Sequence, residues 1–126
     1  MTVELDIVGP PPLAGAEIER LVVLVLASAE VGDGHLAIEF VDSARIRELN
    51  RAHRGIDAPT DVLSFPIDGV EEPALGQREL GDVLICPEHV SDLREAVVHG
   101  VLHLLGMDHE VDDGEMLALQ RELLSW

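Results

Sequence analysis

The sequence of 126 residues contains no lysine, so its eight basic residues are all arginines, and 25 acidic residues bring the formal net charge to −17. Basic side chains that neutralise phosphates normally supply most of a protein's non-specific affinity for nucleic acid. We therefore expect no DNA partner and no tight binding of RNA without other components. A compact group of arginines beside a divalent ion would still create one local positive cleft, so RNA chemistry is not excluded.

Cysteine and long apolar runs are also scarce. The lone cysteine, Cys86, cannot form an internal disulfide, so nothing indicates an oxidising compartment. The N-terminus carries Glu4 and Asp6 in place of the basic region of a signal peptide. The longest wholly apolar run, 21–27, is far shorter than the roughly 20 residues that cross a bilayer. These absences predict a soluble, cytoplasmic protein without membrane contact.

Aromatic residues make up only 2% of the chain, so aliphatic side chains must fill the core that its 47% hydrophobic content allows. The length predicts a single domain over residues 1–126. Apolar residues alternate in some segments and recur with a helical period in others, which predicts a sheet covered by helices. We expect strands at 3–7, 35–41, 62–65 and 82–86, helices at 14–30, from Asp42 or Ser43 through Leu49, at 91–105 and after Asp112, and loops at 50–59 and 67–79.

Three of the six histidines lie within residues 99–109. His99 and His103 are four residues apart on a segment that is apolar nearly all round, which predicts a central buried helix with both rings on one face. Gly106 can adopt the left-handed conformation that ends a helix, so the chain can turn back and bring in His109. Three imidazole ligands leave a tetrahedral metal one open position, which is the catalytic arrangement. The spacing therefore predicts a divalent metal site.

Gly100 follows the first of these histidines, where a zinc protease carries its catalytic glutamate. A glycine inside a helix costs about 1 kcal/mol relative to alanine, so close packing or room beside the metal must matter more at this position. Without that glutamate the site lacks the usual general base for peptide hydrolysis. A metalloprotease is therefore the weaker enzymatic interpretation.

At these residues the sequence resembles the YbeY family of bacterial rRNA-maturation endoribonucleases. The stretch 99–109 matches the family signature H-G-x-L-H-L-x-G-x-D-H at every fixed position. Residues 59–66, Pro-Thr-Asp-Val-Leu-Ser-Phe-Pro, resemble the second hallmark of the family, and 80–86 resembles the strand between the two. The N-terminal part matches only in its pattern.

The resemblance implies a zincin-like α+β fold, with a small mixed sheet of about four strands, a central buried metal-binding helix and flanking helices. It further implies a zinc-dependent, single-strand-specific endoribonuclease that holds one Zn²⁺ per chain through His99, His103 and His109. The implied role is 16S rRNA 3′-end maturation and ribosome quality control, with rRNA, the small ribosomal subunit and its assembly factors as partners. A non-catalytic assembly factor whose metal only stabilises the fold is the main alternative.

Arg54 lies at the position of the family's conserved arginine, and its planar guanidinium suits bidentate contact with a phosphate. We expect it to stabilise charge on the phosphoryl group. Asp61 fits a strand-start cap as well as a functional role, and Ser64 fits either a polar strand face or substrate binding. Asp108 is expected to accept the second N–H of a ligand imidazole or to cap the turn, and the spacing does not decide between them.

Two departures from the family pattern concern the surroundings of the site. Residues 87–98 are fewer than is typical of the family before the metal helix, and Met107 stands where members commonly carry a bulky polar or aromatic residue. Neither change touches a predicted ligand, so they bear on substrate affinity more than on metal binding. The remaining titratable candidates are interpreted as structural: Cys86 as a buried strand residue, and His35, His53 and His89 as surface residues, of which His53 alone is near enough to Arg54 to reach the cleft.

Overall fold

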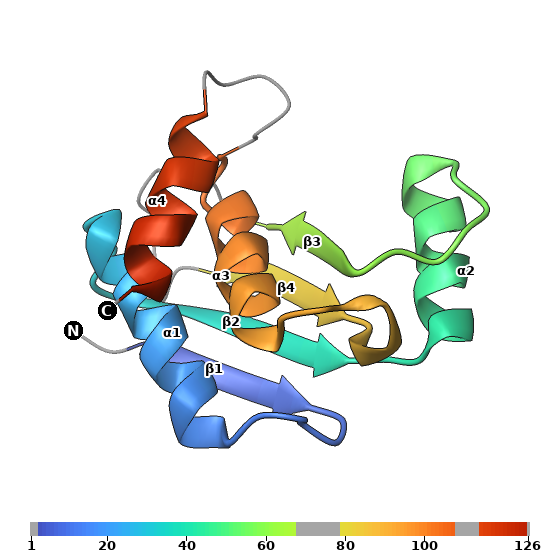
Figure 1. Cartoon of the computed structure of the whole chain (residues 1–126), viewed down its shortest axis with the longest axis horizontal. Coiled ribbons are helices and arrows are strands. Elements are labelled where there is room, and N and C mark those ends of the chain that lie inside the picture. Colours follow the sequence, from blue (N-terminus) through green and yellow to red (C-terminus); the bar gives the residue numbers. More distant parts are fainter. Residues whose placement is uncertain (1–2, 68–78, 108–113, 126) are drawn as a thin grey trace.

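The computed structural model describes residues 3–67, 79–107 and 114–125. Four strands form one sheet in the order β1-β2-β4-β3, in which β1, β2 and β4 are parallel and β3 is an antiparallel edge strand (Figure 1). The expected α+β class and the small mixed sheet are confirmed. The elements in chain order are β1 (Val3–Val8), α1 (Gly15–Ser28), β2 (Gly34–Phe40), α2 (Ser43–Arg54), β3 (Val62–Pro66), β4 (Glu79–Ile85), the short 3-10 helix η1 (Pro87–His89), α3 (Leu93–Leu104) and α4 (Glu115–Leu124).

The main core lies between the sheet and the helices α1, α3 and α4, whereas α2 stands apart from these three helices (Figure 1). Alternate residues of β2, Leu36 and Ile38 among them, are fully buried on the face that meets α1 and α3. A second, smaller cluster places Ile46 of α2 against Leu63 and Leu84 of β3 and β4. None of the helices within the described residues is both long and apolar enough to cross a membrane.

Helix α3 is the central buried helix that the sequence predicts, and it lies close to the sheet at Gly100. A Cβ atom at this position would overlap Cγ1 of Val83 on β4 and would lie 3.1 Å from Cγ1 of Val62 on β3. A side chain fits there only if Val83 and Val62 move. Close packing is therefore sufficient to explain why a glycine interrupts this helix.

Three expectations about the boundaries of elements need correction. Residues 50–54 belong to α2 and not to a loop, because Asn50 is buried and its Nδ2 donates to the carbonyl of Ala58 at 2.9 Å. Helix α3 begins at Leu93 and not at residue 91, and Asp92 caps it by accepting the N–H groups of Arg94 and Glu95. Strand β4 begins at Glu79, before the expected Asp82. Of the two expected starts of α2, Asp42 is the N-cap and Ser43 is the first helical residue, whereas Asp112 lies outside the described residues.

His35 does more than occupy the surface, because it joins three strands on the sheet face opposite the main core. Its Nε2 lies 2.7 Å from Oδ2 of Asp6 on β1, and its Nδ1 lies 2.7 Å from Oε2 of Glu79 on β4. Hydrogen bonds to Glu79 and then to Asp6 raise the pKa of His35 from 6.5 to about 9. The imidazolium therefore ties the three parallel strands together at neutral pH.

This bridge predicts a specific loss of stability in alkali. A pKa raised by folding contributes stability that is fully present below the unfolded value near 6.5 and is lost as the pH rises through about 9. Between pH 6 and pH 10, the free energy of unfolding of the wild type should fall relative to that of His35→Gln, measured by urea denaturation. An NMR titration of His35 with a midpoint near 6.5 would contradict the bridge.

The packing at Gly100 predicts that Gly100→Ala destabilises the protein despite the better helix propensity of alanine. Overpacking of a core typically costs about 1–3 kcal/mol, and urea denaturation would measure the change in the free energy of unfolding. The second substitution Val83→Ala removes the overlapping methyl groups, so the double variant should be less destabilised than the sum of the two single variants. Additive effects would show that the two positions do not compete for space.

Candidate active site

A cavity of about 470 Å³ lies between β3 and the C-terminal half of α3. The histidine pair and Arg54, which come from different elements of the chain, meet in its walls. The position of the cavity depends on the packing of α3 against the edge strand, which brings residues about 40 positions apart in the sequence together. The lining residues are Arg54, Thr60, Asp61, Val62, Leu63, Ser64, Pro66, His99, His103, Gly106 and Met107.

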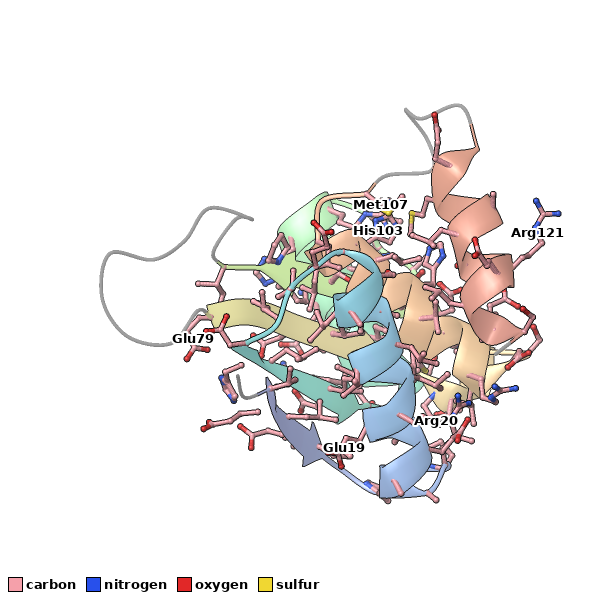
Figure 2. All side chains as sticks on the ribbon, turned by 90° about the vertical axis from the view of Figure 1, so that its left-hand side faces the viewer. Glu19, Arg20, Glu79, His103, Met107 and Arg121 are labelled. Atoms are coloured by element: carbon pink, nitrogen blue, oxygen red, sulfur yellow. The ribbon has the colours of Figure 1, made fainter. Side chains whose placement is uncertain are left out.

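His99 and His103 project from the same face of α3, as their spacing predicts. Their Nε2 atoms lie 3.1 Å apart, and their half-buried rings meet edge-on with centroids 4.7 Å apart. Figure 2 shows His103 beside Met107 near the end of α3, and both residues line the cavity. The two nitrogens therefore converge on one point at the cavity wall.

The helix ends directly after this pair, at the glycine that the sequence indicates. Gly106 has a positive φ of 92°, its N–H donates to the carbonyl of His103 at 3.0 Å, and the N–H of Met107 donates to Leu102 at 3.2 Å. This pair of hydrogen bonds is the Schellman motif, in which a left-handed residue closes the last helical turn. The chain leaves α3 through Gly106 and Met107, which both line the cavity.

His109 and Asp108 lie outside the described residues. Within residues 3–67, 79–107 and 114–125, no three histidine, cysteine, aspartate or glutamate side chains form a metal-binding group. The third ligand therefore stays a prediction from the sequence, and so does the role of Asp108.

Gln120 contacts one member of the histidine pair, and the sequence analysis does not identify it. This residue of α4 is only 5% exposed, and its Oε1 lies 2.8 Å from Nδ1 of His99. An amide oxygen only accepts hydrogen bonds, so Nδ1 of His99 carries the proton and Nε2 presents its lone pair. A signal was present in the sequence, because Gln120 interrupts the apolar face that Met116 and Leu123 form on α4.

On the opposite wall, Ser64 and Asp61 both make structural hydrogen bonds. Oγ of Ser64 donates to the carbonyl of Gly100 at 2.8 Å and fastens β3 to α3. Oδ1 of Asp61 accepts from the N–H of Val62 at 2.8 Å and from Oγ1 of Thr60 at 3.2 Å, as a strand-start cap does. Both residues line the cavity, so a second role toward substrate stays a prediction.

Arg54 is the last residue of α2 and an exposed member of the cavity wall. His53 packs edge-on against Phe65, with ring centroids 4.8 Å apart, and is not among the residues that line the cavity. Cys86 is fully buried, as expected, and burial raises the pKa of its thiol, which makes it a poor nucleophile. Arg54 is therefore the cation that the described residues bring to the histidine pair.

Comparison with known proteins decides the family to which this site belongs. The model of the family described as Endoribonuclease YbeY matches residues 14–126, which is most of the chain. The chain belongs to the YbeY endoribonuclease family. Membership makes it a hydrolase of the nuclease class, and the resemblance read from the histidine signature is confirmed.

Individual YbeY relatives agree with this assignment. The chain is 42% identical over 117 residues to the endoribonuclease YbeY of Nitrobacter hamburgensis, an alignment that covers 79% of this chain and 62% of that protein. It is 36% identical over 154 residues to that of Geobacillus thermodenitrificans, covering 99% and 96%. A solution structure of a Thermotoga maritima protein superposes with a TM-score of 0.59 and 30% identity, covering 96% and 87%.

The contact between Gln120 and His99 predicts the tautomer of that histidine. In metal-free protein the Nδ1–H form of His99 should dominate, and Gln120→Met should reduce its population because the acceptor is lost. The variant should also lose about 1 kcal/mol of stability, the usual value of one hydrogen bond. Nitrogen-15 chemical shifts of the ring report the tautomer, and Gln120→Glu, which keeps an acceptor oxygen, is the matched control. An unchanged tautomer in Gln120→Met would contradict the assignment.

Proposed function

We propose that this chain is a zinc-dependent, single-strand-specific endoribonuclease that acts in 16S rRNA 3′-end maturation and ribosome quality control. Its partners in this proposal are rRNA and the small ribosomal subunit with its assembly factors. Membership of the YbeY family supports the nuclease class. The observation that carries the metal dependence is the convergence of the two imidazole Nε2 atoms, 3.1 Å apart, on the cavity that also contains Arg54.

The donor atoms present fit a zinc ion. Two nitrogens bound tetrahedrally at about 2.0–2.1 Å from one ion lie about 3.3–3.4 Å apart, so the observed 3.1 Å requires only a small adjustment. The acceptor oxygen of Gln120 keeps the lone pair of Nε2 of His99 available to a ligand. In this proposal His99, His103 and His109 hold one Zn²⁺, and Asp108 accepts the second N–H of a ligand ring.

A bound zinc ion supplies a Lewis acid and lowers the pKa of a bound water toward about 7. Side chains of the protein perform the remaining parts of the mechanism. Arg54 binds two non-bridging oxygens of the scissile phosphate and stabilises the charge that develops on them as the phosphodiester bond breaks. The Ser64–Gly100 hydrogen bond holds β3, with Thr60 and Asp61 before it, at a fixed distance from the histidines. Asp61 and Ser64 are the candidates for contact with the RNA.

The packing of α3 argues against peptide hydrolysis. A zinc protease would place its general-base glutamate at position 100, where a Cβ atom already overlaps Val83. The first atom of a glutamate side chain at this position would already meet Val83 and Val62 on the sheet. The cavity therefore suits a reaction that depends on charge stabilisation by the arginine more than on a glutamate base.

The test of this proposal separates charge stabilisation from metal binding. The untagged wild type should cleave a single-stranded fragment of the 16S rRNA 3′ end, contain about one zinc per chain by elemental analysis, and lose activity with a chelator. Arg54→Ala should keep its zinc and lose about 10²–10³-fold in kcat, because it lacks one charge-stabilising group. His103→Ala should lose zinc.

The matched control is Arg121→Ala on α4, whose exposed side chain points away from the molecule in Figure 2. This variant removes one arginine and should keep full activity. Full activity of Arg54→Ala would contradict the role of the arginine. A zinc-containing wild type that cleaves no RNA would favour the non-catalytic assembly factor.

A further inference from the structure

Helix α2 carries a concentration of positive charge in an acidic chain. Four of the eight arginines lie within its 12 residues, although the formal net charge of the chain is −17. Elsewhere, Arg20 and Arg94 are both committed to Glu17, at 2.8 Å and 3.0 Å. The pKa of Glu17 falls to about 2 because of these two arginines, with Arg20 the larger cause. Of the described arginines outside α2, only Arg121 on α4 forms no ion pair, so most of the positive charge available to a ligand lies on α2.

The arginines of α2 differ in their partners. Arg45 lies 3.5 Å from Glu48, and Arg47 lies 2.9 Å from Asp57, whose pKa it lowers. Arg51 and Arg54 form no ion pair within 4.0 Å in the part of the chain that the structure describes. The charge of Arg51 also contributes to the lowered pKa of Asp57, but neither Arg51 nor Arg54 has to leave an ion pair in order to bind an anion.

Their spacing places them on one exposed face of the helix. Arg47, Arg51 and Arg54 follow one another at intervals of four and three residues, beside the face that buries Ile46 and Asn50. We call these three residues the α2 arginine stripe. At about 100° per residue, Arg45 lies about 160° round the helix from Arg47, on the other side.

The stripe ends at the cavity. Arg54 lines the cavity with the histidine pair, and Arg51 lies one turn back, about 4.5 Å along the helix axis. A stacked nucleic-acid strand carries one phosphate about every 3.4 Å of axis, and an extended strand spaces them further apart. Figure 1 shows α2 apart from the other three helices, so none of them covers its outer side.

We propose that Arg51 binds the RNA phosphate next to the one held by Arg54, so that the α2 arginine stripe guides a single strand into the cavity. The inference rests on the proposed function and adds to it the surface that the substrate follows. The strong negative charge of the rest of the chain repels RNA, which restricts binding to this side of the molecule. Arg47 contributes less because Asp57 holds it.

The experiment measures the salt dependence of RNA binding to the full chain with its metal. Fluorescence anisotropy of a labelled single-stranded RNA gives the affinity over a series of potassium chloride concentrations. Each phosphate contact to a single strand contributes about −0.7 to the slope of log K against log salt concentration. Arg51→Gln should therefore make the slope about 0.7 less steep, and Arg51→Lys should restore most of it.

Arg45→Gln is the matched control, because it removes the same charge from the same helix on the side away from the stripe. It should leave the slope unchanged. Asp57→Asn releases Arg47 and should increase both the affinity and the steepness of the slope. Equal slopes for Arg51→Gln and Arg45→Gln would overturn the inference.

The outcomes distinguish this inference from the proposed function. A wild type that binds and cleaves RNA while Arg51→Gln behaves like Arg45→Gln overturns the α2 arginine stripe alone. A smaller slope in Arg51→Gln together with full cleavage by Arg54→Ala supports the stripe and contradicts the catalytic role of Arg54. A wild type that neither binds nor cleaves RNA overturns both.

Discussion

The close approach of α3 to β3 and β4 is the contact on which the site depends. At Gly100 the helix backbone lies so near Val83 and Val62 that a side chain fits there only if these two residues move, and Oγ of Ser64 donates to the carbonyl of the same glycine at 2.8 Å. Dense packing and one hydrogen bond therefore set the distance between the helix and the edge strand. The histidine pair flanks this contact on α3, and the cavity opens beside it.

Much of the fold could be predicted from the sequence, because its local patterns agree with its tertiary structure. The alternation in β1 and β2 and the nearly continuous apolar surface of α3 have one structural interpretation each, and Asp42 and Gly106 mark helix ends by known chemistry. The four-residue spacing of His99 and His103 likewise predicts that both rings share one face of a helix. This prediction needs only the helical period and does not depend on the neighbouring elements.

The errors and omissions concern polar residues whose partners are distant or follow later in the chain. The polarity of Asn50 favours a loop, although its contact with Ala58 lets it lie on the buried face of α2. The role of Gln120 depends on its contact with His99, which lies 21 residues earlier in the sequence and is reached only when α4 packs against α3. The sequence indicates a surface position for His35 because Asp6 and Glu79 come together only in the sheet. Such pairs require a three-dimensional structure.

The position of Gln120 has a consequence for the order in which the site matures. The chain is synthesised from its N-terminus, so both histidines of α3 emerge before the helix that orients one of them. Until α4 has folded against α3, the ring of His99 lacks the acceptor oxygen of Gln120. A nascent chain that already contains the sheet, the cavity and Arg54 therefore still has a His99 ring without its contact to Gln120. Folding of α4 against α3 is therefore required before Gln120 can fix the proton of His99.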